Sequence, residues 1–157
     1  MKFTVIKNLQ KDSAMSLILK GFLFFILLYI VSDIFVMKES FGISAEALHS
    51  TLFGNEEAYI DPINEASFLE FWHTQIFFIM MILLTLSAVF IRVAKRSRNI
   101  LTNILMISAI ASLVSLPLAY YTSKFFINIY VISYFLWHLV AIYMIFYSFW
   151  KLNARSV

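Results

Sequence analysis

The chain has 157 residues, of which 62% are hydrophobic and only 13% are charged, and its formal net charge is +3. A soluble domain of this length needs far more polar residues to cover its surface, so the composition indicates an integral membrane protein. The sequence contains no cysteine. Structural disulfides, Fe–S clusters and thiolate metal sites are therefore excluded.

Four apolar segments are long enough to cross a bilayer as helices. They cover residues of about 15–37, 68–92, 100–121 and 125–150, and roughly 20 mostly apolar residues suffice for one helical span. No small-residue cleavage site follows the first segment, so we expect it to remain as a span and not to be removed as a signal peptide. The sequence therefore predicts an all-α transmembrane four-helix bundle that forms a single membrane domain over residues 1–157.

The basic residues divide unequally between the two ends of these spans. Ten of the twelve Lys and Arg residues fall at one end, in the terminal regions, the segment ends and the short loop 93–99, whereas Lys38 and Lys124 fall at the other. Basic residues are retained on the cytoplasmic side during insertion. We therefore expect both termini and the loop 93–99 in the cytoplasm, and the loop 38–67 outside.

The expected outer loop, residues 38–67, is acidic. Residues 38–70 hold seven of the nine acidic residues of the chain. Within the loop, the apolar spacing of residues 43–53 is typical of a short interfacial helix. Ser67 followed by Glu70 has the spacing of a capping box, so Glu70 is also interpreted as a capping residue at the start of the second span.

The third span combines a row of small residues with a proline. The small residues favour close helix packing in lipid; they are Ser108, Ala109, Ala111, Ser112 and Ser115. Pro117 lies near the expected outer end and has no N–H group. We expect a neighbouring residue to satisfy the carbonyl that Pro117 leaves free.

Four acidic or histidine residues lie within the expected spans, namely Asp33, Glu70, His73 and His138. A charged side chain at the centre of a membrane helix costs about 2.5–3.5 kcal/mol on insertion scales, so each needs a physical explanation. We expect Asp33 to face the bundle and to bind a buried polar partner, near Glu70, His73 or the third span. We also expect Glu70 and His73, three residues apart on one helix, to face the interior together.

Two of these residues suggest a metal site. Glu70 and His73, joined by His49 from the outer loop, would supply the carboxylate and imidazole ligands that Zn, Cu(II) or Fe accepts. A di-iron site is disfavoured because it needs a second Glu-x-x-His pair and two further carboxylates from other spans, and the fourth span offers only His138 with no acidic residue near it. The alternative interpretation is a solvated acidic loop beside a capped helix.

A repeated Trp-His pair suggests haem instead. His73 and His138 each follow a tryptophan in the second and fourth spans, and two imidazoles from facing helices can ligate one haem b. However, His73 lies nineteen residues before Arg92 and His138 thirteen before Lys151. This difference corresponds to roughly 9 Å along the helix axis, which argues against a shared haem.

Two functional interpretations stay open. The first is a non-enzymatic subunit or accessory factor that meets a membrane-protein partner, or a second copy of itself, through its bundle and outer acidic loop. The second is a redox or metal-binding membrane protein that uses His73 with Glu70 or His138 to hold haem b or a divalent metal. The basic cluster lacks interleaved aromatic residues, so nucleic-acid binding is not expected. Abundant Ile, Phe and Lys suit an AT-rich genome, and we expect a multi-pass protein of the bacterial inner membrane.

Overall fold

The structure, a computed structural model, describes residues 13–94 and 98–154, and within these ranges it contains five α-helices and no strand. The helices are α1 (Ser13–Ser40), α2 (Ala45–Phe53), α3 (Glu65–Val93), α4 (Arg98–Tyr121) and α5 (Phe125–Asn153). All but α2 are long and apolar enough to cross a membrane. The predicted all-α transmembrane bundle is therefore confirmed.

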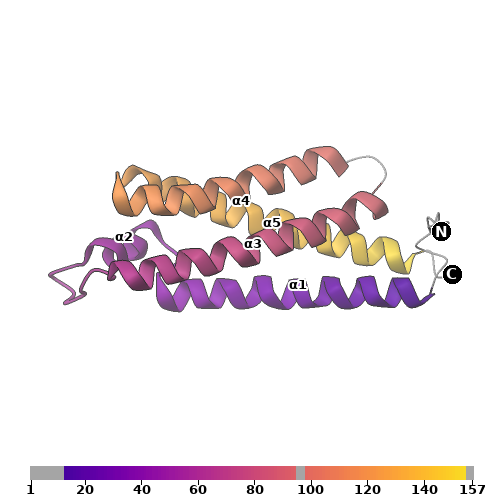
Figure 1. Ribbon diagram of the computed structural model, residues 1–157, viewed down its shortest axis with the longest axis horizontal. Coiled ribbons are helices and arrows are strands. Elements are labelled where there is room, and N and C mark those ends of the chain that lie inside the picture. Colours follow the sequence, from indigo (N-terminus) through magenta and orange to yellow (C-terminus); the bar gives the residue numbers. More distant parts are fainter. Residues whose placement is uncertain (1–12, 95–97, 155–157) are drawn as a thin grey trace.

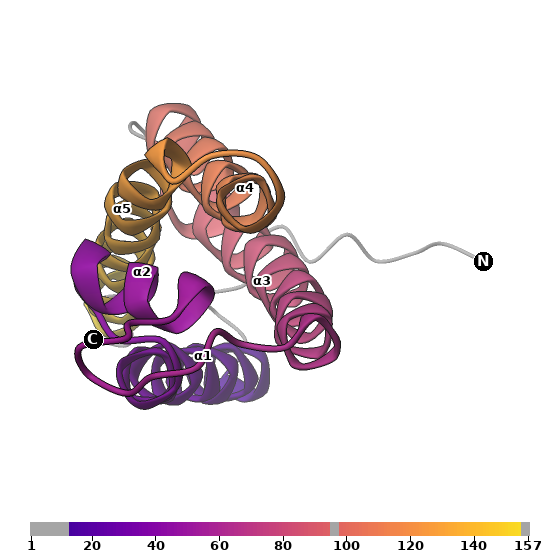
Figure 2. The same cartoon turned by 90° about the vertical axis from the view of Figure 1, so that its left-hand side faces the viewer.

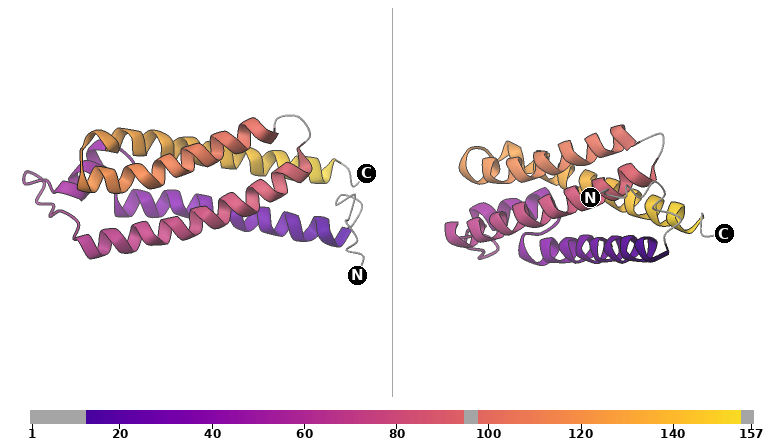
Figure 3. Two further views of the ribbon diagram at one scale, coloured as in Figure 1. Left: turned by 45° about the horizontal axis from the view of Figure 1, so that its top comes forward. Right: turned by 45° about the vertical axis from the view of Figure 1, so that its right-hand side comes forward.

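The four long helices run alongside one another, and α2 closes one end of the bundle (Figure 1). Seen from this end, α1 and α4 lie on opposite sides with α3 and α5 between them, and α2 lies across the opening near α1 and α5 (Figure 2). The start of α1 and the end of α5 lie together at the opposite end (Figure 3). We refer below to the end covered by α2 as the capped end.

The chain uses polar caps and positive-φ glycines to turn at the capped end. The Ser44 Oγ accepts a hydrogen bond from the Ala47 N–H at 3.1 Å, which caps α2 at its start. Gly42 and Gly54 flank the helix with φ of 79° and 80°, a backbone conformation that glycine adopts at little cost. A side chain at Gly42 would also collide with the Cβ of Ala47. These residues allow α2 to fold back over the bundle.

The start of α3 differs from the prediction. Asn64 is the N-cap, and its Oδ1 accepts a hydrogen bond from the Ser67 N–H at 2.9 Å. Ser67 lies inside the helix, and Glu70 lies beyond the first turn, so the predicted capping box between them is wrong. Asparagine is among the preferred N-cap residues, and it takes this role three residues earlier in the chain.

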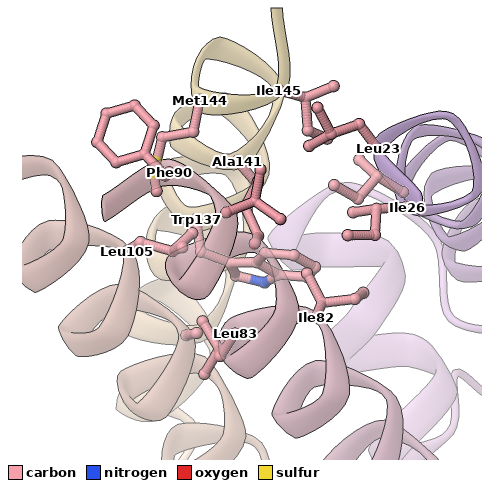
Figure 4. Close-up of a cluster of buried hydrophobic side chains, with 14 of the residues drawn as sticks. Leu23, Ile26, Ile82, Leu83, Phe90, Leu105, Trp137, Ala141, Met144 and Ile145 are labelled. Carbon is pink, nitrogen blue, oxygen red and sulfur yellow. The ribbon is translucent and has the colours of Figure 1, made fainter. Parts of the chain in front are cut away.

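Apolar side chains fill the bundle in two clusters. In the larger one, the fully buried Trp137 of α5 lies among Leu23 of α1, Ile82 of α3 and Leu105 of α4 (Figure 4). The smaller cluster lies toward the capped end and contains Phe68. The interior of the bundle is therefore apolar, so a polar side chain buried there is costly unless it finds a partner.

The small-residue row of α4 faces its neighbours, and α4 packs most extensively against α5. Ser108, Ser112 and Ser115 are buried. Each hydroxyl donates to a carbonyl of its own helix, as Ser112 does to Ala109 at 3.0 Å. The serines therefore allow close packing without leaving a hydroxyl unpaired.

Candidate functional site

Asp33 of α1 lies inside the bundle and is only 4% exposed. It is seven residues before the end of α1 at Ser40, a depth of roughly 10 Å below that helix end. A buried carboxylate costs several kcal/mol unless hydrogen bonds and charges replace the water that it loses. The surroundings of Asp33 are therefore the strongest candidate for a functional site.

Four side chains bind the Asp33 carboxylate, two at each oxygen. At Oδ1, the Gln75 Nε2 donates at 2.7 Å and the Tyr29 hydroxyl at 3.5 Å. At Oδ2, the Tyr134 hydroxyl donates at 3.0 Å, and the His138 Nε2 lies at 3.1 Å. A carboxylate has about four acceptor positions, so these partners fill its capacity. We call these five residues, from α1, α3 and α5, the Asp33 cluster.

His138 is fixed at both of its ring nitrogens. Its Nδ1 lies 2.8 Å from the main-chain oxygen of Tyr134, and a carbonyl can only accept, so Nδ1 carries a hydrogen. The contact between Nε2 and the Asp33 Oδ2 then holds one further proton, on the nitrogen or on the oxygen. Both arrangements leave the pair without net charge, which reduces the free energy needed to bury it.

Aromatic rings enclose the imidazole. The ring centroids of Trp137 and Tyr134 lie 3.8 Å and 4.1 Å from that of His138. His138 is 1% exposed as a result. The histidine is thus held in one orientation, with Nε2 directed at Asp33.

A cavity of about 10 Å³ adjoins the cluster, which is room for roughly one water molecule. Its polar lining comes from Gln75, Ser112, Tyr130 and Tyr134. Gln75 and Tyr134 also bind Asp33, so the cavity connects the cluster to the serine row of α4. The space is far too small for a substrate or a cofactor.

Glu70 and His73 lie elsewhere, and the expectation that they face the interior is wrong. Both are exposed. The buried side of α3 at this level carries Phe68 and Gln75, and residues two apart in a helix point roughly 200° away from each other. Glu70 follows Phe68 by two residues and His73 precedes Gln75 by two, so both face outward.

The residues expected to bind a metal are likewise not gathered. His49 is half-buried in α2, where its ring packs on Phe53 with centroids 5.1 Å apart. Within residues 13–94 and 98–154, no group of three or more His, Asp or Glu side chains is placed to hold a metal ion. The structure therefore does not bring His49, Glu70 and His73 together as one ligand set.

The two histidines expected to ligate haem have opposite environments. His73 points out of the bundle, whereas both ring nitrogens of His138 are engaged inside it. A haem ligand needs a ring nitrogen directed at the iron. This arrangement does not favour haem binding between His73 and His138.

Sequence reasoning singled out Asp33 and His138 but missed Gln75 and Tyr134 as their partners. The spacing could have pointed to Tyr134, because Tyr134 and His138 are four residues apart and share a helix face. Tyr29 and Asp33 have the same spacing. The depth of Asp33 was misjudged. α1 stops short of the other helices at the capped end (Figure 1), so Asp33 reaches the level of His138 instead of that of His73.

No curated protein and no solved structure matches the chain significantly. A family model described as a transmembrane helical domain matches residues 42–156. The match includes Gln75, Tyr134 and His138 and begins after α1, which carries Asp33. Together with its four apolar helices, this match shows that the chain is a small polytopic membrane protein and belongs to the Aq_1264_TM family of transmembrane helical domains.

Proposed function

We propose that this chain is a non-enzymatic subunit or accessory factor of the bacterial inner membrane, and that it meets a partner protein through the loop between α2 and α3. One observation carries the proposal. Tyr59, in this loop, is 96% exposed and has a φ of 53°. A non-glycine residue in this conformation costs on the order of 1–3 kcal/mol, and such strain concentrates at functional sites.

The loop holds Tyr59 in a defined position. Main-chain hydrogen bonds join Asn55 and Ile60 in both directions, at 2.8 Å and 3.0 Å. The Asn55 Oδ1 also accepts from the Ala58 N–H at 3.2 Å. The resulting tight turn projects beyond the ends of the helices (Figure 1). A glycine would fit this backbone better, so the tyrosine side chain needs another explanation.

The chemistry of the turn suits a basic partner surface. Glu56, Glu57 and Asp61 lie within three residues of Tyr59 in the sequence and are all exposed. Tyrosine is enriched at the centres of protein interfaces, where its ring fills a pocket and its hydroxyl stays hydrogen-bonded. The charge distribution along the chain predicts that this turn lies on the outer side of the membrane. The partner therefore presents a pocket rimmed by Lys or Arg on the outer side of the membrane.

The Asp33 cluster supports the non-enzymatic part of the proposal. The carboxylate has a donor at each acceptor position, and the imidazole is engaged at both nitrogens. A general base or a nucleophile needs a free atom directed at its substrate. The cluster instead satisfies itself, as a structural network does.

Photocrosslinking in the native membrane tests the proposal. A benzoylphenylalanine residue is placed at Tyr59 in one variant and at Tyr143 in another. Tyr143 is the matched control, because it is an exposed tyrosine of α5 on the side of the bundle. We expect a discrete protein adduct from position 59 and lipid adducts alone from position 143. An adduct of twice the chain mass identifies the partner as a second copy.

Charge reversal provides the second arm. The double change Glu56→Lys and Glu57→Lys should abolish the adduct, because like charges then face each other across the interface. The thermal unfolding midpoint should stay unchanged, since both side chains are exposed. An adduct that persists in this variant, or position 59 yielding lipid adducts alone, overturns the proposal.

A further inference from the structure

α1 is the span least embedded in the bundle. In the most apolar window of each span, 17% of the residues are buried in α1, compared with 39%, 33% and 44% in α3, α4 and α5. Lipid solvates apolar side chains as well as a neighbouring helix does, so the hydrophobic effect does not drive α1 onto the other helices. Packing and polar contacts must therefore determine where α1 docks.

The strongest polar contact of α1 is made by Asp33, which is bound from two other spans at once. The three donors outside α1 are the Gln75 Nε2 of α3 and the Tyr134 hydroxyl and His138 Nε2 of α5. The Tyr134 hydroxyl also lies 3.3 Å from the main-chain oxygen of Asp33. We call these three donors the carboxylate socket.

One member of the socket, His138, is oriented without help from α1. The His138 Nδ1 is bonded to the Tyr134 main-chain oxygen at 2.8 Å, and the imidazole packs on the Trp137 ring, so both contacts lie within α5. The helices that carry the socket also contact each other directly, and α4 packs against both. The family match, which begins at residue 42, likewise covers the socket and omits α1.

We propose that the socket is a recognition site for a carboxylate carried on a transmembrane helix. Asp33 fills it in this chain, so that α1 is a releasable helix latched onto a folded α2–α5 unit. Other contacts of α1 are weaker or less specific. Leu23, Ile26 and Ile30 pack into the apolar core, and the Tyr130 hydroxyl donates to the Met37 Sδ at 3.4 Å. Lipid can replace the apolar contacts, and sulfur is a weak acceptor.

Distances between spin labels measure the docking of α1 in the complete chain. The sequence contains no cysteine, so introduced cysteines are the only labelling sites. Phe25 of α1, Ile107 of α4 and Leu139 of α5 are exposed on the sides of the bundle, and labels there leave the core intact. The pair 25/107 reports on α1, and the pair 107/139 reports on the α4–α5 unit. Both are measured by pulsed electron paramagnetic resonance in liposomes.

We expect Asp33→Ala to remove the single 25/107 distance peak of the parent protein and to replace it with a broad distribution. The 107/139 peak should stay where it is. Asp33→Asn is the second variant, because an amide keeps the size of the side chain but carries no negative charge and cannot share a proton with His138; it should broaden the 25/107 peak partially. Tyr130→Phe is the matched control on α5, since it removes the bond to Met37 and leaves the socket intact, and both peaks should persist.

Two results overturn the proposal. An unchanged 25/107 peak in both Asp33 variants means that packing alone docks α1. Loss of the 107/139 peak in both variants means that Asp33 holds the whole bundle together and that no independent α2–α5 unit exists.

Discussion

The indole Nε1 of Trp72 donates a hydrogen bond to the main-chain oxygen of Leu113 at 2.8 Å. Leu113 lies four residues before Pro117, which is inside α4, so its oxygen is the one that the proline leaves without an intrahelical donor. A side chain of α3 thus supplies the bond that α4 lacks. The expectation that a neighbouring residue satisfies this carbonyl is confirmed, and the residue is Trp72.

This relationship predicts a stability effect. Trp72→Phe keeps an aromatic ring but leaves the Leu113 carbonyl unpaired, so it should lower the free energy of unfolding by about 1–3 kcal/mol. Pro117→Ala restores a main-chain N–H for the same carbonyl. The loss caused by Trp72→Phe should therefore be smaller in a Pro117→Ala background. Reversible unfolding in mixed micelles measures the free energy of unfolding of the parent protein, the two single variants and the double variant.

The matched control is Trp150→Phe, because Trp150 is exposed near the end of α5. This change should move the free energy of unfolding by no more than about 0.5 kcal/mol. If Trp72→Phe lowers the free energy of unfolding by the same amount with and without Pro117, the bond to Leu113 does not compensate for the proline.

The distribution of basic residues predicts the topology. A reporter inserted next to Asn55 should read external, whereas reporters between Ser97 and Arg98 and after Val157 should read cytoplasmic. Paired phosphatase and fluorescent-protein fusions distinguish the two sides. A cytoplasmic signal from the Asn55 insertion contradicts both the orientation and the outer partner that we propose for Tyr59.

The exposure of His73 predicts that it is dispensable for the fold. His73→Gln should change the free energy of unfolding by no more than about 0.5 kcal/mol, whereas His138→Gln, in the Asp33 cluster, should be strongly destabilising. An absorption spectrum of the purified protein provides a second readout. A Soret band that disappears in His73→Gln would show that His73 ligates haem, against its outward position here.

The span pattern could be predicted from the sequence, because crossing a bilayer requires long apolar helices and the basic residues mark their ends. The rotation of each helix could not. In water an amphipathic pattern reveals the buried side, but in lipid both sides of a helix are apolar, so α3 gives little indication of whether Glu70 or Gln75 faces inward. The structure shows that Gln75 does.

The burial of Asp33 followed from the free energy of exposing a carboxylate to lipid, but its partners depend on relative helix depth. α1 ends before the other helices do, and the chain then turns at Gly42 into α2 (Figure 1). Hydropathy does not report where a helix stops relative to its neighbours. Tyr134 and His138 could therefore be recognised as sharing a face, but not as facing Asp33.

The most direct test of the central claim, that Asp33 and His138 form one buried pair, is a double-mutant cycle. Asp33→Asn and His138→Gln should each destabilise the protein, by as much as about 3–5 kcal/mol, because each leaves its partner buried and uncompensated. Once the pair is broken, the second change adds little. The loss of unfolding free energy in the double variant should therefore be smaller than the sum of the two single losses by more than about 1 kcal/mol. Two losses that simply add would contradict the pairing of Asp33 with His138.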